Sequence, residues 1–313
     1  MSFISFVIPC YRSEKTIEKV IEEIRLTMSK HNDDFEIILT NDASPDNTLG
    51  KIRELADKYD NVTGIDMAKN FGQHAGLMAG MRESKGDIVV FLDDDCQTPA
   101  DECYKLIDKL NEGYDVVYAS YPEKKHSGFR NFGSLVNKKM TEYLLEKPKD
   151  LYISSYFAAR RYVVDEMIKY ANPYPYVIGL VLRTTKNITN VPVNHREREE
   201  GRSGYTFGKL MALWINGFTA FSVKPLRIAT YMGLISAFFG LLYAIYAVIN
   251  KFINPAAPLG WTSMIIILLV LGGMILAVLG LIGEYIGRIY ISMNNSPQYV
   301  IRERIKGKNR SEQ

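Results

Sequence analysis

The sequence feature that most restricts the fold is a pair of long apolar stretches near the C-terminus. Residues 228–250 and 259–283, which are 23 and 25 residues long, contain no Asp, Glu, Lys or Arg. About 20 apolar residues in a helix cross the hydrocarbon core of a bilayer, and helices buried in soluble proteins are rarely so long and so free of charge. The stretches therefore predict two membrane-spanning helices. The alternative is an apolar helical hairpin packed inside a soluble core.

The charges around these stretches predict their orientation. The turn between them, marked by Asn254, Pro255 and Pro258, carries only Lys251. Basic residues flank the pair on both sides: Lys209, Lys224 and Arg227 before it, and Arg288, Arg302, Arg304, Lys306, Lys308 and Arg310 after it. Because basic residues stay on the cytoplasmic side, we expect both termini there and the turn outside. Glu284 and Arg288 have the i, i+4 spacing of a helical ion pair.

The chain before these stretches alternates predicted strands and helices. Apolar strands are expected at residues 3–9, 35–40, 62–67, 87–92 and 115–119. Apolar stripes predict helices after Glu14, after Pro45 and over residues 73–84. A fourth helix is expected to have Thr98 as its N-cap and Pro99 as its first residue, and to end near Gly113. This alternation predicts an α/β fold, with a mostly parallel sheet covered by helices on both faces.

Composition narrows the classes of function. The apolar share is 47% and the net charge is only +3, without the clustered basic stripe that a nucleic-acid partner needs. Cys10, Cys96 and Cys103 are odd in number and scattered, which indicates a reducing compartment and argues against a cysteine metal site. The N-terminal "MSFISFVIPCY" lacks the basic start and the long apolar run of a signal peptide, and is expected to form the first strand.

Three adjacent acids directly follow the apolar run at residues 88–92. In an extended chain Asp93 and Asp95 point to one side and Asp94 to the other. Two converging carboxylates repel unless a cation lies between them, and hard ions such as Mg²⁺ or Mn²⁺ take one or two carboxylates together with substrate phosphates. Gln97 offers a further oxygen. On these residues alone, a metal site and a solvated acidic turn that caps the next helix remain equally open.

Turn-forming and polar residues also follow three other predicted strands. They are Pro9, Tyr11 and Glu14 after the first strand, Asn41, Asp42 and Asp46 after the second, and Lys69, Asn70, Gly72 and Gln73 after the third. The carboxyl ends of parallel strands meet at one rim of a sheet, where ligands bind. Any one segment alone would be interpreted as a turn or a helix cap. Their coincidence on one rim predicts a binding site.

Two segments lie between the predicted sheet and the membrane. Residues 195–202, "HREREEGR", form a charge run that by itself indicates a solvated surface, although its place just before the membrane favours a phosphate site. Residues 206–227 have an apolar face, which predicts an amphipathic helix at the membrane surface. Packing against the soluble domain is the alternative. The face consists of Phe207, Leu210, Met211, Leu213 and Trp214.

These segments together resemble glycosyltransferase family 2, in its polyprenyl-phosphate branch and nearest to the formamido-arabinose subgroup. The matching stretches cover nearly the whole chain: "VIPCYRSE", "NDASPDNT", "AKNFGQHAGLMAG", "DDDCQTP", "HREREEGRSGYTFGKL", "KPLR" and "LIGEYIGRIY". The resemblance implies a GT-A-type nucleotide-sugar domain at residues 1–205, the interfacial segment at 206–227, two membrane helices, and a basic cytoplasmic tail at 284–313. It also implies a bacterial inner membrane location and an assembly of several copies.

The resemblance also implies roles for particular residues. Asp93 and Asp95 would be catalytic and would hold Mg²⁺ or Mn²⁺ together with Gln97. The donor, a UDP-linked nucleotide sugar, would be bound by Pro9, Tyr11, Glu14, Asn41, Asp42, Lys69, Asn70, Gln73 and Asp94. The phosphate of the lipid acceptor would be bound by Arg130, His195, Arg198, Arg202, Ser203 and Tyr205.

The chain departs from the family pattern at three places. Asn41 stands where the family has the Asp that recognises the base. Ser155 and Phe157 replace the Asp and Arg of a Gly-Asp-Phe-Arg segment, which removes one candidate acid or base, and the formamido-arabinose subgroup also lacks that Asp. Gly204 stands where relatives often have Lys, and the neighbouring Arg202 could take its place.

The implied reaction moves one sugar from a nucleotide diphosphate to polyprenyl (undecaprenyl) phosphate with inversion. A phosphate monoester has a second pKa of about 6, so its oxygen is nucleophilic at neutral pH without a general base. A cation between Asp93 and Asp95 would offset the charge on the leaving diphosphate.

Two other classes of protein stay open. One is a processive polysaccharide synthase, but such synthases carry a Gln-x-x-Arg-Trp segment, and neither Trp214 nor Trp261 follows an Arg. The other is a non-catalytic membrane protein that assists the transport of lipid-linked sugars. The intact Asp93 and Asp95 argue against that second class.

Overall fold

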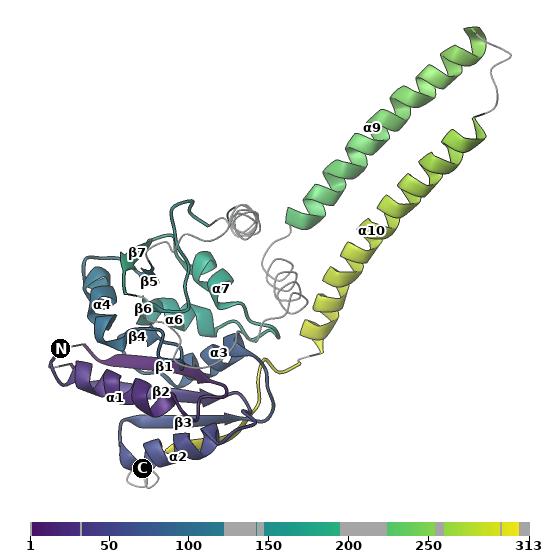
Figure 1. Ribbon diagram of the computed structural model, residues 1–313. Coiled ribbons are helices and arrows are strands. Elements are labelled where there is room, and N and C mark those ends of the chain that lie inside the picture. Colours follow the sequence, from purple (N-terminus) through teal and green to yellow (C-terminus); the bar gives the residue numbers. More distant parts are fainter. Residues whose placement is uncertain are drawn as a thin grey trace. The chain divides into compact units, whose positions relative to one another are not determined.

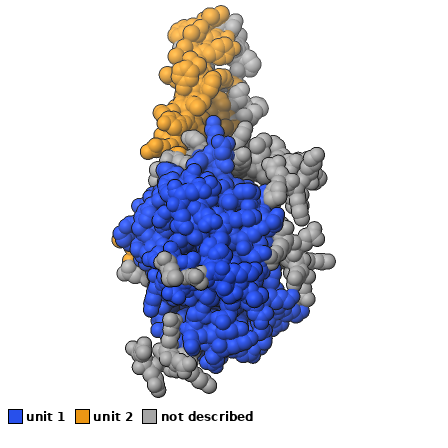
Figure 2. Space-filling model, turned by 90° about the vertical axis from the view of Figure 1, so that its left-hand side faces the viewer, with its two compact units in different colours: residues 1–213, 295–313 blue, residues 214–294 orange. Residues whose placement is uncertain are grey.

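The chain divides into two compact units. The computed structural model describes residues 2–31, 33–121, 142, 147–194, 224–253, 260–294 and 296–306. One unit comprises residues 1–213 and 295–313 and the other comprises residues 214–294, shown in blue and orange in Figure 2. The second unit is therefore an insertion, because the chain returns to the first unit after it.

Among the described residues, an eight-stranded sheet forms the centre of the first unit, in the order β7-β5-β6-β4-β1-β2-β3-β8 (Figure 1). Its strands are β1 (Ile4–Cys10), β2 (Phe35–Asn41), β3 (Val62–Met67), β4 (Ile88–Phe91), β5 (Val116–Ser120), β6 (Phe157–Arg160), β7 (Ile188–Pro192) and β8 (Ile301–Lys306). The four neighbours β4, β1, β2 and β3 run parallel, as do β5 and β7, whereas β6 and β8 are antiparallel to their neighbours. The predicted mostly parallel sheet is confirmed, and the five predicted strands are β1 to β5.

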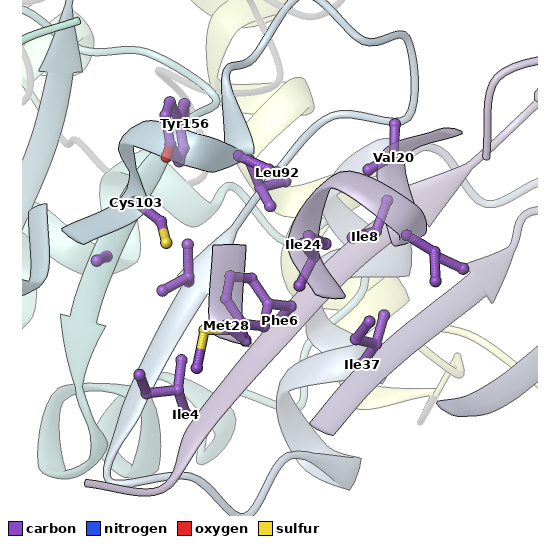
Figure 3. Close-up of a cluster of buried hydrophobic side chains, with 14 of the residues drawn as sticks. Ile4, Phe6, Ile8, Val20, Ile24, Met28, Ile37, Leu92, Cys103 and Tyr156 are labelled. Carbon is purple, nitrogen blue, oxygen red and sulfur yellow. The ribbon is translucent and has the colours of Figure 1, made fainter. Parts of the chain in front are cut away.

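Helices cover both faces of this sheet, as predicted. On one face α1 (Ile17–Met28), α2 (Thr48–Lys58) and α4 (Cys103–Asn111) share an apolar core with β1. On the other face α3 (Gln73–Glu83) packs against β1 and β2, next to α6 (Arg161–Ile168) and α7 (Val177–Thr184). Figure 3 shows part of the first core, where α1 contributes Val20, Ile24 and Met28 and alternate residues of β1 contribute Ile4, Phe6 and Ile8.

The close approach of α3 to the sheet depends on glycine. A Cβ atom on Gly80 would lie 2.4 Å from Cγ1 of Val7, and one on Gly76 would lie 3.3 Å from Cβ of Pro9. Val7 and Pro9 alternate with the residues that face α1, so they point to the opposite face. Pro9 is buried beneath α3 in this arrangement. Pro9, which is predicted to bind the donor, therefore supports the rim of the sheet from beneath α3.

The helix after the acidic triplet begins later than predicted. It starts as a single 3₁₀ turn, η1 (Ala100–Glu102), which leads into α4, and no side chain caps it. The Thr98 hydroxyl instead donates to the backbone carbonyl of Asp93 at 3.5 Å, so the prediction of Thr98 as the N-cap is wrong. The predicted end is correct, because Gly113 follows α4 in a left-handed conformation with φ of 110°.

The second unit contains two long helices, α9 (Lys224–Ile253) and α10 (Trp261–Met293), which run side by side (Figure 1). Both are long and apolar enough to cross a membrane, and no residue of either candidate span, Leu226–Tyr243 or Val270–Met293, is buried. α9 extends beyond the predicted 228–250 at both ends, whereas α10 begins two residues after the predicted 259 and continues beyond 283. Glu284 and Arg288 pair at 2.7 Å as predicted. Of the predicted interfacial segment, residues 206–223 lie outside the described residues.

The segment after the hairpin is not a separate tail. Residues 284–293 belong to α10, and residues 301–306 form β8, which pairs with β3 at the edge of the sheet. Two of the basic residues expected in a tail make ion pairs there, because Arg302 contacts Asp66 and Arg304 contacts Glu83. This corrects the expectation of a basic tail at 284–313 for the residues up to 306, since residues 284–293 continue α10 and the charges of Arg302 and Arg304 are paired within the first unit.

Candidate active site

The loops that follow the four parallel strands all turn through a left-handed residue. These residues are Arg12 after β1, Ala43 after β2, Gly72 after β3 and Cys96 after β4, with φ angles of 62°, 48°, 90° and 61°. A left-handed conformation costs a non-glycine residue about 1–3 kcal/mol, and such residues cluster at functional sites. Three of the four turns at the carboxyl-end rim therefore hold a non-glycine residue in a strained conformation, which the surrounding structure keeps in place.

The central acid of the triplet belongs to the scaffold of the rim. The Asp94 carboxylate accepts hydrogen bonds from the backbone N–H of Tyr11 at 2.9 Å and from the hydroxyl of Ser13. Burial raises the pKa of Asp94, and these two hydrogen bonds act in the opposite direction. Asp94 thus joins the loop after β4 to the loop after β1.

The other two acids of the triplet have different partners. The Asp93 carboxylate accepts hydrogen bonds from the Gln73 amide at 3.0 Å and from the Ser155 hydroxyl, so it lies between the start of α3 and the segment before β6. Asp95 accepts a hydrogen bond from the backbone N–H of Gln97 at 3.1 Å. Burial raises the pKa of Tyr121, and the charges of Asp93 and Asp95 raise it further. The fields of both carboxylates therefore reach the same ring.

The donor set fits a divalent cation that shares its coordination with a ligand. Asp93 and Asp95 are two partly exposed carboxylates on one short loop. Within the described ranges, no group of three or more His, Cys, Asp or Glu residues could hold a metal by itself. Mg²⁺ is usually bound by one or two carboxylates with substrate phosphates and water completing its shell. This arrangement suits an ion that binds together with a diphosphate.

The turn after β2 holds two of the predicted donor-binding residues. The Asn41 side chain is buried, and its Nδ2 donates to Oδ1 of Asp66 at 2.8 Å while its Oδ1 accepts from the backbone N–H of Ser44 at 3.2 Å. Asp42 accepts from the backbone N–H groups of Phe71 and Gly72 at 2.7 and 2.8 Å. Burial raises the pKa of Asp42, and these N–H groups oppose it. Asp42 therefore fastens the turn after β3 to the turn after β2.

The loops after β1 and β2 are also joined to each other. Asp46 accepts from the hydroxyl and N–H of Thr48, from the Ser44 hydroxyl and from the backbone N–H of Glu14, and Glu14 accepts from the N–H of Asn47 at 3.0 Å. Burial acts to raise the pKa of Asp46, but these hydrogen bonds outweigh it and the pKa is lowered. Glu14 thus contributes to the rim through this loop contact.

The exposed groups at the rim include an aromatic ring and two cations. Tyr11 is 45% exposed, and the Arg12 guanidinium lies 5.6 Å from the centre of its ring. Lys69 lies after β3 with its Nζ 5.0 Å from the Phe71 ring centre, and Asn70 donates to the backbone carbonyl of Asp42 at 3.2 Å.

The structure describes the chain up to Asn194, the residue before the segment expected to bind the acceptor. The predicted residues Arg130, His195, Arg198, Arg202, Ser203 and Tyr205 lie outside the described residues. Asn194, directly before them, donates to both carboxylate oxygens of Glu102, through Nδ2 at 2.6 Å and its backbone N–H at 3.1 Å. Because Glu102 lies in η1, Asn194 is held near the acidic loop.

Sequence reasoning missed several partners in this site. Ser13 donates to Asp94, and burial and the charges of Asp93 and Asp95 raise the pKa of Tyr121. Asp66 holds Asn41. None of these three partners is identified from the sequence. Ser155 was noted only as a replacement, although its hydroxyl contacts Asp93. The signal for Asp66 is its place in the sequence: a carboxylate inside a strand as buried as β3 requires a partner.

Family models match two parts of the chain. The model described as glycosyl transferase family 2 matches residues 5–168, and the model described as GtrB C-terminal hairpin matches residues 224–289. The second match begins where α9 begins and lies wholly within the second unit.

Curated relatives match along nearly the full length. The chain is 32% identical over 304 residues to an undecaprenyl-phosphate 4-deoxy-4-formamido-L-arabinose transferase of Proteus mirabilis (strain HI4320), covering 96% of this chain and 93% of that protein. It is 31% identical over 300 residues to the glycosyltransferase YkcC of Bacillus subtilis (strain 168), with the same two coverages. Among solved structures, a glucosyl-3-phosphoglycerate synthase from Mycobacterium tuberculosis in complex with Mn²⁺ and UDP-glucose has the same fold, with a TM-score of 0.52, 23% identity, and coverage of 74% of this chain and 78% of that one.

Proposed function

The chain belongs to glycosyl transferase family 2, and we propose that it transfers one sugar from a nucleotide diphosphate sugar to the phosphate of a membrane polyprenol. The observation that carries the proposal is the rim itself, where Asp93 and Asp95 lie on one loop, cross-linked through Asp94 to the loop of Tyr11. In an open α/β sheet ligands bind at this rim. The hairpin of α9 and α10 supports an acceptor that resides in lipid.

The donor nucleotide would lie across the loops after β1 and β2. The exposed ring of Tyr11 offers a face on which a base can stack, and Asn41 offers an amide for hydrogen bonds to the base. Lys69, after β3, would add a positive charge near the phosphates. We take uridine diphosphate as the carrier, and the UDP-glucose complex of the glucosyl-3-phosphoglycerate synthase with the same fold supports that choice.

Asp93 and Asp95, together with Gln97, would hold Mg²⁺ or Mn²⁺. When bound, such an ion offsets the negative charge that builds on the leaving diphosphate. Gln73 and Ser155 fix the Asp93 carboxylate, and the N–H of Gln97 fixes that of Asp95. Because these groups are oriented before the donor arrives, little reorganisation is needed during transfer.

The acceptor would be the phosphate of a polyprenol, as in the undecaprenyl-phosphate relative of Proteus mirabilis. A phosphate monoester is largely dianionic at neutral pH, so its oxygen attacks without a general base and on the side opposite the leaving group, which inverts the anomeric carbon. Arg198, Arg202, Ser203 and Tyr205, with His195 and Arg130, would bind this phosphate. The contact of Asn194 with Glu102 supports a place for that segment near the acidic loop.

In this proposal the catalytic unit lies at the cytoplasmic face of a bacterial plasma membrane, in an assembly of several copies. The basic residues around the start of α9 and the single lysine near its end, Lys251, support the orientation, since basic residues stay on the cytoplasmic side.

A transfer assay tests the proposal. The purified full-length chain is incubated in detergent with undecaprenyl phosphate, labelled UDP-sugars, and Mg²⁺ or Mn²⁺, and the lipid products are separated and weighed by mass spectrometry. The proposal expects one lipid-linked sugar that requires the metal. A polymeric product would instead identify a processive synthase, and no product with any nucleotide sugar would indicate a non-catalytic protein.

A further inference from the structure

The strand that follows the hairpin carries a β-bulge next to the rim. In the pairing of β8 with β3, Asp66 lies opposite Glu303 and Met67 lies opposite Ile301, so Arg302 is an extra residue with no counterpart on β3. A bulge turns the extra side chain out of the regular alternation, and bulges are frequent beside active sites for this reason.

The bulged residue contacts a buried carboxylate. Arg302 donates through Nη1 to Oδ2 of Asp66 at 3.2 Å and through Nη2 to the backbone carbonyl of Ala68 at 2.8 Å. The Asp66 side chain is only 1% exposed, whereas that of Arg302 is 58% exposed. A buried carboxylate is costly unless a charge and hydrogen bonds compensate it, so Arg302 supplies the positive charge that Asp66 needs.

The other oxygen of Asp66 sets the orientation of Asn41. The two residues lie opposite each other in the register of β2 and β3, and Oδ1 of Asp66 accepts from Nδ2 of Asn41 at 2.8 Å. On its other side the Asn41 amide oxygen accepts from the N–H of Ser44. A flipped amide would place its oxygen against the carboxylate and its NH₂ against an N–H, which are two repulsive contacts. Asp66 therefore determines which edge of the Asn41 amide donates and which accepts.

We propose that Arg302 and Asp66 are positioning residues for nucleobase recognition, which makes the strand after the membrane hairpin a part of the nucleotide site. This inference rests on the proposed function, in which Asn41 binds the base. Arg302 does not contact the base in this proposal but acts through two contacts, because it holds Asp66 and Asp66 holds Asn41. The chain thus returns from the hairpin to complete the site that the first 100 residues begin.

Contacts other than those of Arg302 keep β8 in place. The role of Arg302 can therefore be tested separately from the pairing of β8 with β3. Gln298 donates to the backbone carbonyls of Tyr170 and Asn172 at 3.2 and 3.0 Å, and the N–H of Ala68 donates to the carbonyl of Val300 at 2.8 Å. Ion pairs join Glu303 to Arg53 and Arg304 to Glu83. Replacing Arg302 should leave the strand paired with β3.

The test compares UDP with inorganic pyrophosphate as probes. Binding of each, in the presence of Mg²⁺, is measured by titration calorimetry on the full-length protein in detergent. Arg302→Met is expected to weaken UDP binding about tenfold, the loss from disturbing one oriented hydrogen bond, and to change pyrophosphate binding less than about twofold. Arg302→Lys should recover part of the UDP affinity. Arg304→Gln, which removes an exposed pair on the same strand, is the matched control and should bind both probes as the wild type does.

A double variant tests the route through Asp66. Asp66→Asn removes the buried charge, so adding Arg302→Met to it should cost much less UDP affinity than Arg302→Met costs alone. Equal UDP affinities for Arg302→Met and Arg304→Gln would overturn the inference, as would an equal loss for UDP and pyrophosphate, which would indicate a general loosening of the fold. A wild-type protein that binds pyrophosphate and UDP equally would contradict the proposed base site itself, and so separates the two failures.

Discussion

The first unit and the hairpin use apolar residues in opposite ways. In the first unit, large side chains such as Phe6 and Ile24 are fully buried between sheet and helices, and polar groups line the rim. In the hairpin, Phe238, Leu268 and Leu276 are among many large apolar side chains that are exposed, and neither candidate span contains a buried residue. Removal of apolar side chains from water therefore drives folding of the first unit, whereas the exposed apolar surface of the hairpin is suited to an apolar solvent. The proposed chemistry is concentrated where the first unit departs from this pattern, at its polar rim.

The largest effect is expected from the rim, because it holds the proposed metal ligands. Asp95→Ala should lower the rate of transfer by about three orders of magnitude, since one of two carboxylates that would hold the cation is lost. The measurement is the initial rate with saturating donor and lipid. Asp57→Ala, at an exposed acid on α2, is the control and should leave the rate unchanged. Normal turnover by the Asp95 variant would exclude a metal role for this residue.

The same charge substitution at two equally exposed leucines tests whether the two units lie in different solvents. Leu268 in α10 and Leu26 in α1 are both 65% exposed. Leu268→Lys should oppose membrane insertion by about 2.5–3.5 kcal/mol, because Leu268 lies near the middle of the uncharged stretch 259–283 and a cation there would be poorly solvated in a membrane. Leu26→Lys should leave insertion unchanged. The fraction of protein that resists alkaline extraction from membranes measures the effect, and equal behaviour of the two variants would contradict a membrane-spanning α10.

Acid should weaken the first unit through His74. Burial lowers the pKa of His74 to about 4, and its Nδ1 has no hydrogen-bond partner among the described residues. The folded state keeps this histidine neutral while the unfolded chain protonates near pH 6.5, so its contribution to stability is lost as the pH falls from about 6.5 to about 4. The loss approaches about 3 kcal/mol.

The matched comparison for this prediction is His74→Gln. The difference in unfolding free energy between wild type and variant should change across that pH window and stay flat above pH 7.5. The comparison is needed because burial raises the pKa of Asp42 and Asp94, whose protonation acts in the opposite direction. A constant difference from pH 4 to 8 would show that His74 is solvated.

The smallest effect is expected from packing between α3 and β1. Gly80→Ala should destabilise the first unit by about 1–3 kcal/mol, because the added methyl group would lie 2.4 Å from Val7. Gly233→Ala in α9 is the comparison, since a Cβ there meets no atom within 4 Å. Thermal unfolding measures both, and a Gly80 variant as stable as the wild type would mean that α3 can move away from the sheet without cost.

The sequence could predict the four neighbouring parallel strands β1 to β4 and also β5, but not β6, β7 and β8. β1 to β5 contain apolar runs that are buried on both faces, which is a local signal. β6 is the four-residue stretch "FAAR", β7 is mostly half-exposed, and β8 is "IRERIK" with one buried residue. These three strands exist because neighbours in space, β4, β5 and β3, offer free edges, and a chain distant in sequence cannot be matched to an edge by composition.

The site was predictable in its location and less so in the roles of its residues. Polar residues after four parallel strands fix the rim, but they do not tell which side chains face a ligand. Asp42 and Asp94 turn inward to join loops, while Asp93 meets Gln73 and Ser155 from elsewhere in the chain. The link from Arg302 to Asn41 spans more than 200 residues and depends on a bulge that no local pattern predicts.

The most direct test of the central claim is a crystal structure of the protein grown with UDP and Mn²⁺, with the metal located by its anomalous scattering. We expect the Mn²⁺ peak about 2.0–2.3 Å from a carboxylate oxygen of Asp95, with the diphosphate bound to the same ion and the uracil ring beside Tyr11 and Asn41. A metal peak or nucleotide bound away from the rim, with Asp93 and Asp95 contacting neither, would contradict the account.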